Sequence, residues 1–206
     1  MEMERRFLPW EETEVRVKEG KDGPVLEGYT AVFNSWSEDL GGFREKIRGG
    51  AFAKTLKEAD VRALKNHDPN FILARNKAGN LELREDDKGL HYSASLDENI
   101  SYVADLIRSI NRGDISGNSF AFRTVKDGWN EDNDERELLE VKLFDVGPVV
   151  FPAFASPKVK VAQRALDKAK ELKSVVIDRE QHKGVIARDE QKILEIDILT
   201  IETGGL

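Results

Sequence analysis

Apolar and polar residues alternate along much of this chain with the two-residue period of half-buried β-strands. The strands predicted before residue 100 cover residues 15–18, 25–33, 43–47, 61–65, 81–84 and 89–96. The first two are joined by segment 19–24, which contains two glycines and a proline, and the last two form a predicted hairpin. The pattern therefore indicates a mainly β fold.

Helical spacing of apolar residues appears in few places. The best-defined predicted helix is Asn99–Arg112, whose apolar residues recur three and four positions apart: Val103, Leu106, Ile107 and Ile110. Asn99 and Ser101 are the candidate caps of its first turn. A short helix is predicted within residues 50–57, and a second charged helix at 158–173. The chain thus combines strands with a few helices.

The predicted helix leads through Arg112–Gly117 into a strand that contains Ser119. From Ser119 onward, small or polar residues alternate with Phe120 and Phe122. We expect the two phenylalanines to anchor the strand in a core and Ser119 to face the opposite side. A hydroxyl on a rigid strand can serve as a nucleophile if a base reaches it. An isolated serine between phenylalanines is more often an ordinary sheet residue. Ser119 is therefore a candidate nucleophile only if the chain also supplies a base.

Three histidines are candidates for that base: His67, His91 and His182. His67 follows the predicted strand 61–65, and Pro69 ends that strand, which places the imidazole at a fixed yet exposed position. His91 lies within a predicted strand and His182 near the C-terminal end. Histidine is the usual partner of a serine nucleophile because it titrates near neutral pH. We therefore take His67 as the candidate base.

A carboxylate would complete the set. Residues 138–146 predict a strand in which Glu140 and Asp145, five residues apart, face opposite sides. Charged residues are disfavoured in strands, so the presence of Glu140 in this strand suggests a functional role. Asp145 is the rival candidate for the carboxylate. The acidic segment 127–137 before this strand is predicted to be a flexible insert.

The order His67, Ser119, Glu140 excludes two familiar serine-hydrolase templates. An α/β-hydrolase places its serine first, within a Gly-x-Ser-x-Gly motif, and its histidine last. Residues 117–121 lack the final glycine of that motif. Chymotrypsin-like proteases place serine last. Metal-ligand spacing such as His-Glu-x-x-His and a glycine-rich phosphate loop are both absent from the sequence. We therefore expect neither a metal nor a cofactor.

Composition narrows the function further. The 206 residues include 32 Lys and Arg against 39 Asp and Glu, a net charge of −7, which argues against a nucleic-acid-binding protein. There is no cysteine, and no apolar run is long enough to span a membrane. We expect a soluble, intracellular protein with one domain at 1–173. Residues 174–206 are weakly patterned and are predicted to be a flexible or removable appendage.

Three blocks of the sequence resemble one known family. The first joins Gly50–Phe52 to Leu64–Asp68 and Leu73–Arg75; the second is Arg112–Phe122; the third runs from Glu140 to Val149 and continues in Phe151–Ala153. Their order and spacing are similar to those of the prohead, or capsid-maturation, serine proteases of tailed bacteriophages. This family is distantly related to the herpesvirus assemblins. The resemblance covers roughly residues 25–155.

The resemblance implies an α+β, mainly β fold: a small antiparallel β-barrel surrounded by a few helices, as in assemblins. It implies that His67 is the catalytic base and Ser119 the nucleophile. In assemblins a second histidine occupies a His-Val-x-Leu context, which Glu140–Leu143 fills here, so the resemblance assigns Glu140 to orient His67. One departure is Asn118, where relatives more often carry an apolar residue.

The resemblance also implies a function. The expected enzyme is a serine endopeptidase that cleaves the scaffolding segment of the major capsid protein precursor, and itself, within the assembling prohead in the host cytoplasm. It could form homo-oligomers, and no membrane or nucleic-acid partner is expected. Two alternatives stay open: a catalytically silent scaffold or capsid-interaction protein on the same fold, and an esterase that uses the same residues.

Overall fold

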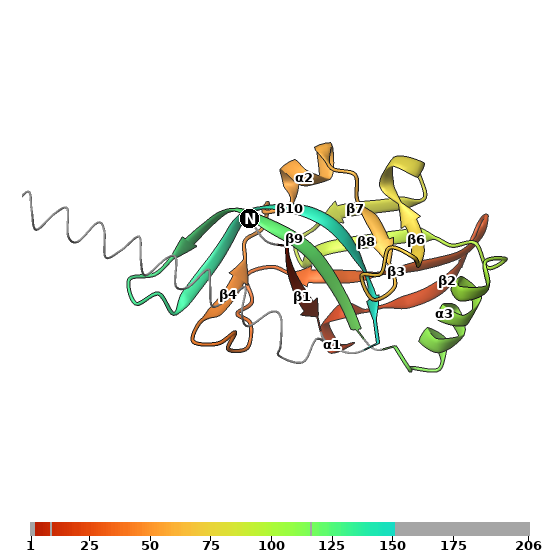
Figure 1. The fold of residues 1–206 in the computed structure, drawn as a ribbon, viewed down its shortest axis with the longest axis horizontal. Coiled ribbons are helices and arrows are strands. Elements are labelled where there is room, and N and C mark those ends of the chain that lie inside the picture. Colours follow the sequence, from red (N-terminus) through yellow and green to blue (C-terminus); the bar gives the residue numbers. More distant parts are fainter. Residues whose placement is uncertain (1–2, 9, 116, 151–206) are drawn as a thin grey trace, which may run out of the picture. The chain divides into compact units, whose positions relative to one another are not determined.

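The computed structural model describes residues 3–8, 10–115 and 117–150, which form mostly strands with a few short helices (Figure 1). The predicted helix 158–173 and the predicted boundary between 173 and 174 lie outside the described residues. The elements are β1 (Glu4–Leu8), α1 (Trp10–Thr13), β2 (Arg16–Gly20), β3 (Gly23–Val32), β4 (Arg44–Ile47), α2 (Ala53–Glu58), β5 (Arg62–Leu64), β6 (Ile72–Arg75), η1 (Asn76–Ala78), β7 (Leu81–Glu85), β8 (Gly89–Ser95), α3 (Ser101–Asn111), β9 (Gly117–Trp129) and β10 (Glu135–Val149).

The strands pair into two sheets. The larger has the order β1-β9-β10-β5-β6, with β4 also paired to β10, and the smaller has the order β2-β3-β8-β7. Among the described residues no ladder closes either sheet into a barrel, so the barrel expectation is not confirmed, whereas the mainly β character is. The pairing is not wholly antiparallel either, because β4 and β5 both run parallel to β10.

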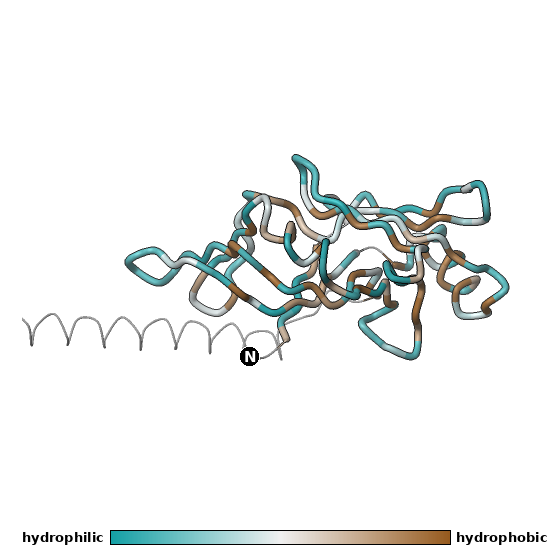
Figure 2. Tube along the Cα trace, turned by 90° about the horizontal axis from the view of Figure 1, so that it is seen from above, coloured by the Kyte–Doolittle hydropathy of each residue, from teal (hydrophilic) through white to brown (hydrophobic). Residues whose placement is uncertain are grey.

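Aromatic side chains from both sheets and from Phe52, which directly precedes α2, form the core. The ring centroids of Phe120 and Phe122 are 5.0 Å apart, and the ring of Phe120 meets that of Phe52 edge-on at 5.5 Å. Tyr92 and Leu26 of the smaller sheet are also fully buried. In Figure 2 the hydrophobic segments lie mainly along the strands and the hydrophilic ones mainly in the connections. As predicted, the two phenylalanines anchor β9.

The predicted long helix is confirmed as α3, which buries Val103, Leu106 and Ile110. Its predicted capping is wrong. The helix begins after Ile100 without a side-chain cap, and the side-chain and backbone amides of Asn99 instead donate to Asp97 Oδ1 at 2.9 and 3.0 Å. Asn99 therefore stabilises the turn that precedes the helix.

The predicted flexible insert at 127–137 is also wrong. β9 continues to Trp129 and β10 begins at Glu135, so the segment is the end of a long hairpin in which Trp129 pairs with Arg136. The Arg136 side chain is only 2% exposed and donates hydrogen bonds to several carboxylates. A buried charge produces no apolar pattern, which is why alternation in the sequence did not reveal this part of the sheet.

At Gly147, β10 lies so close to β5 that a side chain would not fit. A Cβ atom added there would lie 2.2 Å from the carbonyl oxygen of Leu64, and Gly147 has a φ of +149°. We expect Gly147→Ala to lower the free energy of unfolding by about 3 kcal/mol or more. The added methyl group forces the β10 and β5 backbones apart, and alanine is also strained at this φ. Gly79→Ala is the matched control: its φ is +81°, with nothing within 4 Å of the added atom. That variant should lose only about 1–2 kcal/mol in urea unfolding, and equal losses would contradict the close approach.

Candidate functional site

Three side chains that are far apart in the sequence form one hydrogen-bonded row: Asp145, His67 and Ser119. Nδ1 of His67 contacts Oδ1 of Asp145 at hydrogen-bond distance, and Nε2 of His67 lies 2.7 Å from Oγ of Ser119. The side chains of His67 and Asp145 are 7% and 10% exposed, and Ser119 is 2% exposed. The row is therefore largely shielded from water, which strengthens its electrostatic interactions.

Ser119 lies on β9, which is paired on both sides within the larger sheet. On β9 it is opposite Phe7 of β1 on one side and Gly147 of β10 on the other. Its neighbour Phe120 is 1% exposed in the core, as the alternation predicted. Strand pairing on both sides and a buried anchor thus hold the hydroxyl in a rigid position.

His67 lies in the tight turn after β5 rather than at the end of the strand itself. Asn66 and His67 both adopt left-handed conformations, with φ of 56° and 57°, which are uncommon outside glycine. The turn is attached to the end of β10: the Asn66 amide donates to the carbonyl of Pro148 at 3.0 Å, and Asn66 Oδ1 accepts from the amide of Val150 at 2.9 Å. Strained backbone of this kind concentrates at functional sites. Here the conformation of the turn directs the imidazole towards Ser119.

A β-bulge brings Asp145 to the face of the sheet that carries Ser119. Leu143 pairs with Phe122, but Asp145 pairs with Ala121, so β10 contains one extra residue at Phe144. Residues directly opposite each other share a face, and Ala121 shares the face of Ser119. Strict alternation had placed Asp145 on the face of Leu143. The bulge reverses that assignment.

The structure does not bring Glu140 to His67. The Glu140 carboxylate lies 3.2 Å from Nζ of Lys54 on α2, and both residues line a pocket of about 570 Å³ beside β10. Hydrogen bonding to Glu140, together with its charge, raises the pKa of Lys54 above the usual 10.5. The prediction that Glu140 orients the imidazole followed its sequence context, whereas the contact with His67 is made by its rival, Asp145.

The other candidate histidines take no part in this row. His91 lies on β8, where its ring meets Tyr29 edge-on at 5.1 Å. Burial, followed by the nearby Arg84, lowers its pKa below 6.5, so it stays neutral in the sheet. His182 lies outside the described residues.

Sequence reasoning missed β1, which supplies a backbone group to the site. Oγ of Ser119 donates a hydrogen bond of 2.8 Å to the carbonyl oxygen of Arg6. The hydroxyl therefore has two neighbours, this carbonyl and Nε2 of His67, but only one proton. Nothing in residues 4–8 indicates a strand, since they include Glu4, Arg5 and Arg6 in succession.

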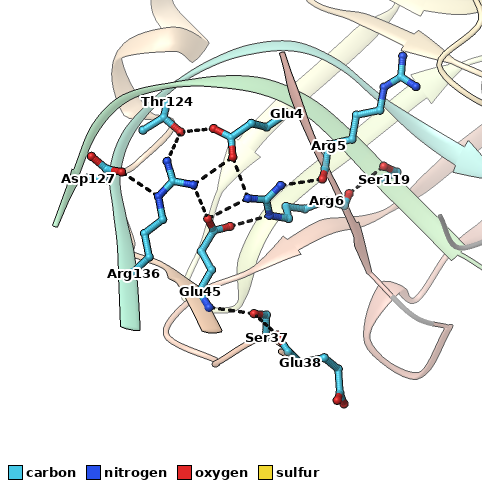
Figure 3. Close-up of polar contacts among 10 residues, drawn as sticks. All are labelled: Glu4, Arg5, Arg6, Ser37, Glu38, Glu45, Ser119, Thr124, Asp127 and Arg136. Carbon is cyan, nitrogen blue, oxygen red and sulfur yellow. Dashed lines mark hydrogen bonds and ion pairs between the residues drawn. The ribbon is translucent and has the colours of Figure 1, made fainter. Parts of the chain in front are cut away.

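A buried cluster of four charged residues, Glu4, Arg6, Glu45 and Arg136, holds β1 in place (Figure 3). We call it the buried charge cluster. Arg6 lies 2.8 Å from Glu4 and 2.7 Å from Glu45, while Arg136 lies 3.0 and 2.9 Å from the same two carboxylates. Burial by itself would raise the pKa of Glu4, but the two arginines and a hydrogen bond from Thr124 lower it below 4.5 overall. Glu4 thus stays charged at neutral pH.

Asn118 joins the two sheets directly beside the nucleophile. It is fully buried, accepts a hydrogen bond from the Tyr92 hydroxyl at 3.0 Å and donates one to the Tyr29 carbonyl at 3.0 Å. Burial raises the pKa of Tyr92, so its hydroxyl remains a donor. The hydrogen-bonding groups of this buried amide are therefore satisfied by the smaller sheet.

In the described part of the chain, no three His, Cys, Asp or Glu side chains converge as metal ligands. None of the helices formed by those residues is long and apolar enough to cross a membrane.

A carboxylate, an imidazole and a hydroxyl in hydrogen-bonded sequence, held on a mainly β scaffold, are the arrangement used by serine hydrolases. Comparison with known proteins identifies the family. The caudovirus prohead serine protease family matches residues 11–172, and the chain belongs to that family. The match begins after β1.

Individual proteins are also similar to the chain. The prohead protease of Enterobacteria phage HK97 is 28% identical over 195 residues, which cover 89% of this chain and 83% of the relative. Among solved structures, the capsid assembly protease of bacteriophage T4 is 15% identical and has a TM-score of 0.49. That alignment covers 74% of this chain and all of the T4 chain.

Proposed function

We propose that the chain is a serine endopeptidase whose catalytic residues are Ser119, His67 and Asp145. The observation that carries this proposal is the hydrogen-bonded row that joins the three side chains across the sheet. Membership of the prohead serine protease family supports it independently, because the family description names both the enzyme class and the serine.

In the proposed mechanism, His67 is neutral with its proton on Nδ1, which donates a hydrogen bond to the Asp145 carboxylate. Nε2 is then free to take the hydroxyl proton as Ser119 attacks a peptide carbonyl, and the imidazolium that forms is stabilised by the Asp145 carboxylate. His67 returns the proton to the leaving amine, and water then releases the acyl-enzyme. In the resting arrangement the hydroxyl donates to the carbonyl of Arg6, so it must turn towards His67 before attack.

We further propose that the substrates are the scaffolding segment of the capsid protein precursor and the protease itself, within the assembling prohead in the host cytoplasm. The family and the name of the HK97 relative support this proposal. Self-cleavage would limit the time for which the enzyme acts.

Intact mass measured with and without a fluorophosphonate tests the proposal. We expect the wild-type chain to gain one covalent adduct on Ser119 and to cleave the cognate capsid precursor. Ser119→Ala should gain no adduct and cleave nothing. A wild-type chain that is neither labelled nor active beside the precursor would support the silent scaffold instead. Hydrolysis of simple esters without any protein cleavage would support the esterase.

A further inference from the structure

The sheet face that carries Ser119 also carries three cationic side chains: Arg5, Arg123 and Lys142. Arg5 pairs with Ala121 across the β1–β9 ladder, and Arg123 pairs with Lys142 across the β9–β10 ladder. Ser119, Ala121 and Arg123 alternate along β9 on one face, and directly opposite residues share that face. We call these three cations the basic strip.

Figure 3 agrees with this placement. It shows the Arg5 side chain directed away from the buried charge cluster, while the Arg6 side chain points into it. Successive residues of β1 therefore serve two purposes. Arg6 fastens the strand to its neighbours, and Arg5 is left on the side of the nucleophile.

The basic strip lacks compensating charge. Among the described residues, no carboxylate pairs with Arg5, Arg123 or Lys142. On the part of β10 nearest the strip, Glu140 is already engaged with Lys54 and Asp145 with His67. Like charges directly opposite each other, as in Arg123 and Lys142, destabilise a sheet. This repulsion stands out in a chain with a net charge of −7, and an anionic group bound at the strip would relieve it.

The strip lies within reach of the proposed nucleophile. Arg5 is one alternation away from Phe7, the residue opposite Ser119, and diagonal neighbours on a sheet face lie about 7–8 Å apart. An arginine side chain spans much of that distance and can hold a carboxylate through two parallel hydrogen bonds. A polypeptide lying across Ser119 would therefore place its neighbouring side chains over the strip.

We propose that the basic strip is a specificity site that binds Asp or Glu side chains of the substrate polypeptide close to the scissile bond. The proposal rests on the proposed function for its substrate, but the binding it predicts can be measured without catalysis. A polypeptide fits better than a nucleic acid because the strip adjoins the hydrolytic row and the chain as a whole is acidic, which repels polyanions at longer range.

Binding to the Ser119→Ala variant tests the strip directly. We would measure fluorescence anisotropy with labelled hexaglutamate, hexaglutamine and a six-nucleotide single-stranded DNA at low salt. Hexaglutamate should bind about tenfold more tightly than hexaglutamine, and Arg5→Gln or Arg123→Gln should each remove about two- to fivefold of that difference. Lys77→Gln, which removes an exposed cation on η1, should change nothing.

Cleavage by the chain with Ser119 intact tests whether binding directs catalysis. A mixed peptide library should be cut with Asp or Glu enriched at a fixed position near the scissile bond. Arg123→Glu should shift that preference towards Lys or Arg, whereas Lys77→Gln should leave it unchanged.

Three results would overturn the inference: equal binding of hexaglutamate and hexaglutamine, an equal loss in Lys77→Gln, or DNA binding that exceeds hexaglutamate binding and depends on Arg5 in the same way. A failure of the proposed function alone would give a different result. In that case hexaglutamate binds as expected, but the chain with Ser119 intact neither cuts peptides nor takes up the fluorophosphonate.

Discussion

Replacing Asp145 with Asn is expected to lower kcat for peptide cleavage by about 10⁴-fold, whereas Glu140→Gln should leave it within about twofold. In the structure Asp145 contacts Nδ1 of His67, while Glu140 pairs with Lys54. An amide at position 145 can donate to the imidazole and so favours the tautomer that leaves Nε2 protonated. That nitrogen can then no longer accept the proton of Ser119. Steady-state kinetics on a quenched fluorescent peptide would measure both variants.

The two substitutions are matched because each changes one carboxylate of β10 into its amide. The Glu140–Lys54 pair is partly exposed, with side chains 32% and 64% accessible, so its loss should have little effect on stability. Urea unfolding would check that both variants are folded. A loss of activity in Glu140→Gln as large as that in Asp145→Asn would contradict the assignment of Asp145.

Replacing Arg136 with Leu is expected to lower the free energy of unfolding by about 3–5 kcal/mol. Arg136 is 2% exposed and lies within 3.0 Å of both Glu4 and Glu45, so the substitution leaves two buried carboxylates with a single arginine between them. Urea unfolding followed by tryptophan fluorescence measures the loss. The control is Arg108→Leu on α3, where arginine and its partner Asp105 are 71% and 70% exposed. That pair should contribute less than about 1 kcal/mol.

The same cluster predicts how stability depends on pH. The pKa of Glu4 is lower in the folded chain than its ordinary value of 4.5. Its contribution to stability is therefore complete above that value and is lost as the pH falls through the folded pKa. Arg136→Leu removes one of the two cations that lower this pKa, so the pKa should move back towards 4.5 and the stability lost on acidification should be smaller than in the wild type. Unfolding curves between about pH 2 and 6 that fall in parallel would contradict this role of Arg136.

Local patterns in the sequence determined several elements of the fold. Alternation predicted the β2–β3 and β7–β8 hairpins, and helical spacing predicted α3, because each of these elements buries apolar side chains at its own period. The same reasoning directed attention to Ser119, whose neighbours Phe120 and Phe122 are both buried. It also selected His67, from a strand ended by proline, and the structure places that side chain beside Ser119.

Tertiary structure alone decided the rest. Asp145 reaches His67 because one extra residue at Phe144 reverses the side to which β10 directs its side chains, and no local pattern signals a bulge. Arg6 enters the site through a backbone carbonyl, which any residue type could provide. β1 and the far end of the β9–β10 hairpin are held by buried charges, whose partners come from distant parts of the chain. Periodicity records which side chains avoid water, whereas a strand's register and the pairing of buried charges depend on neighbours that only the folded chain brings together.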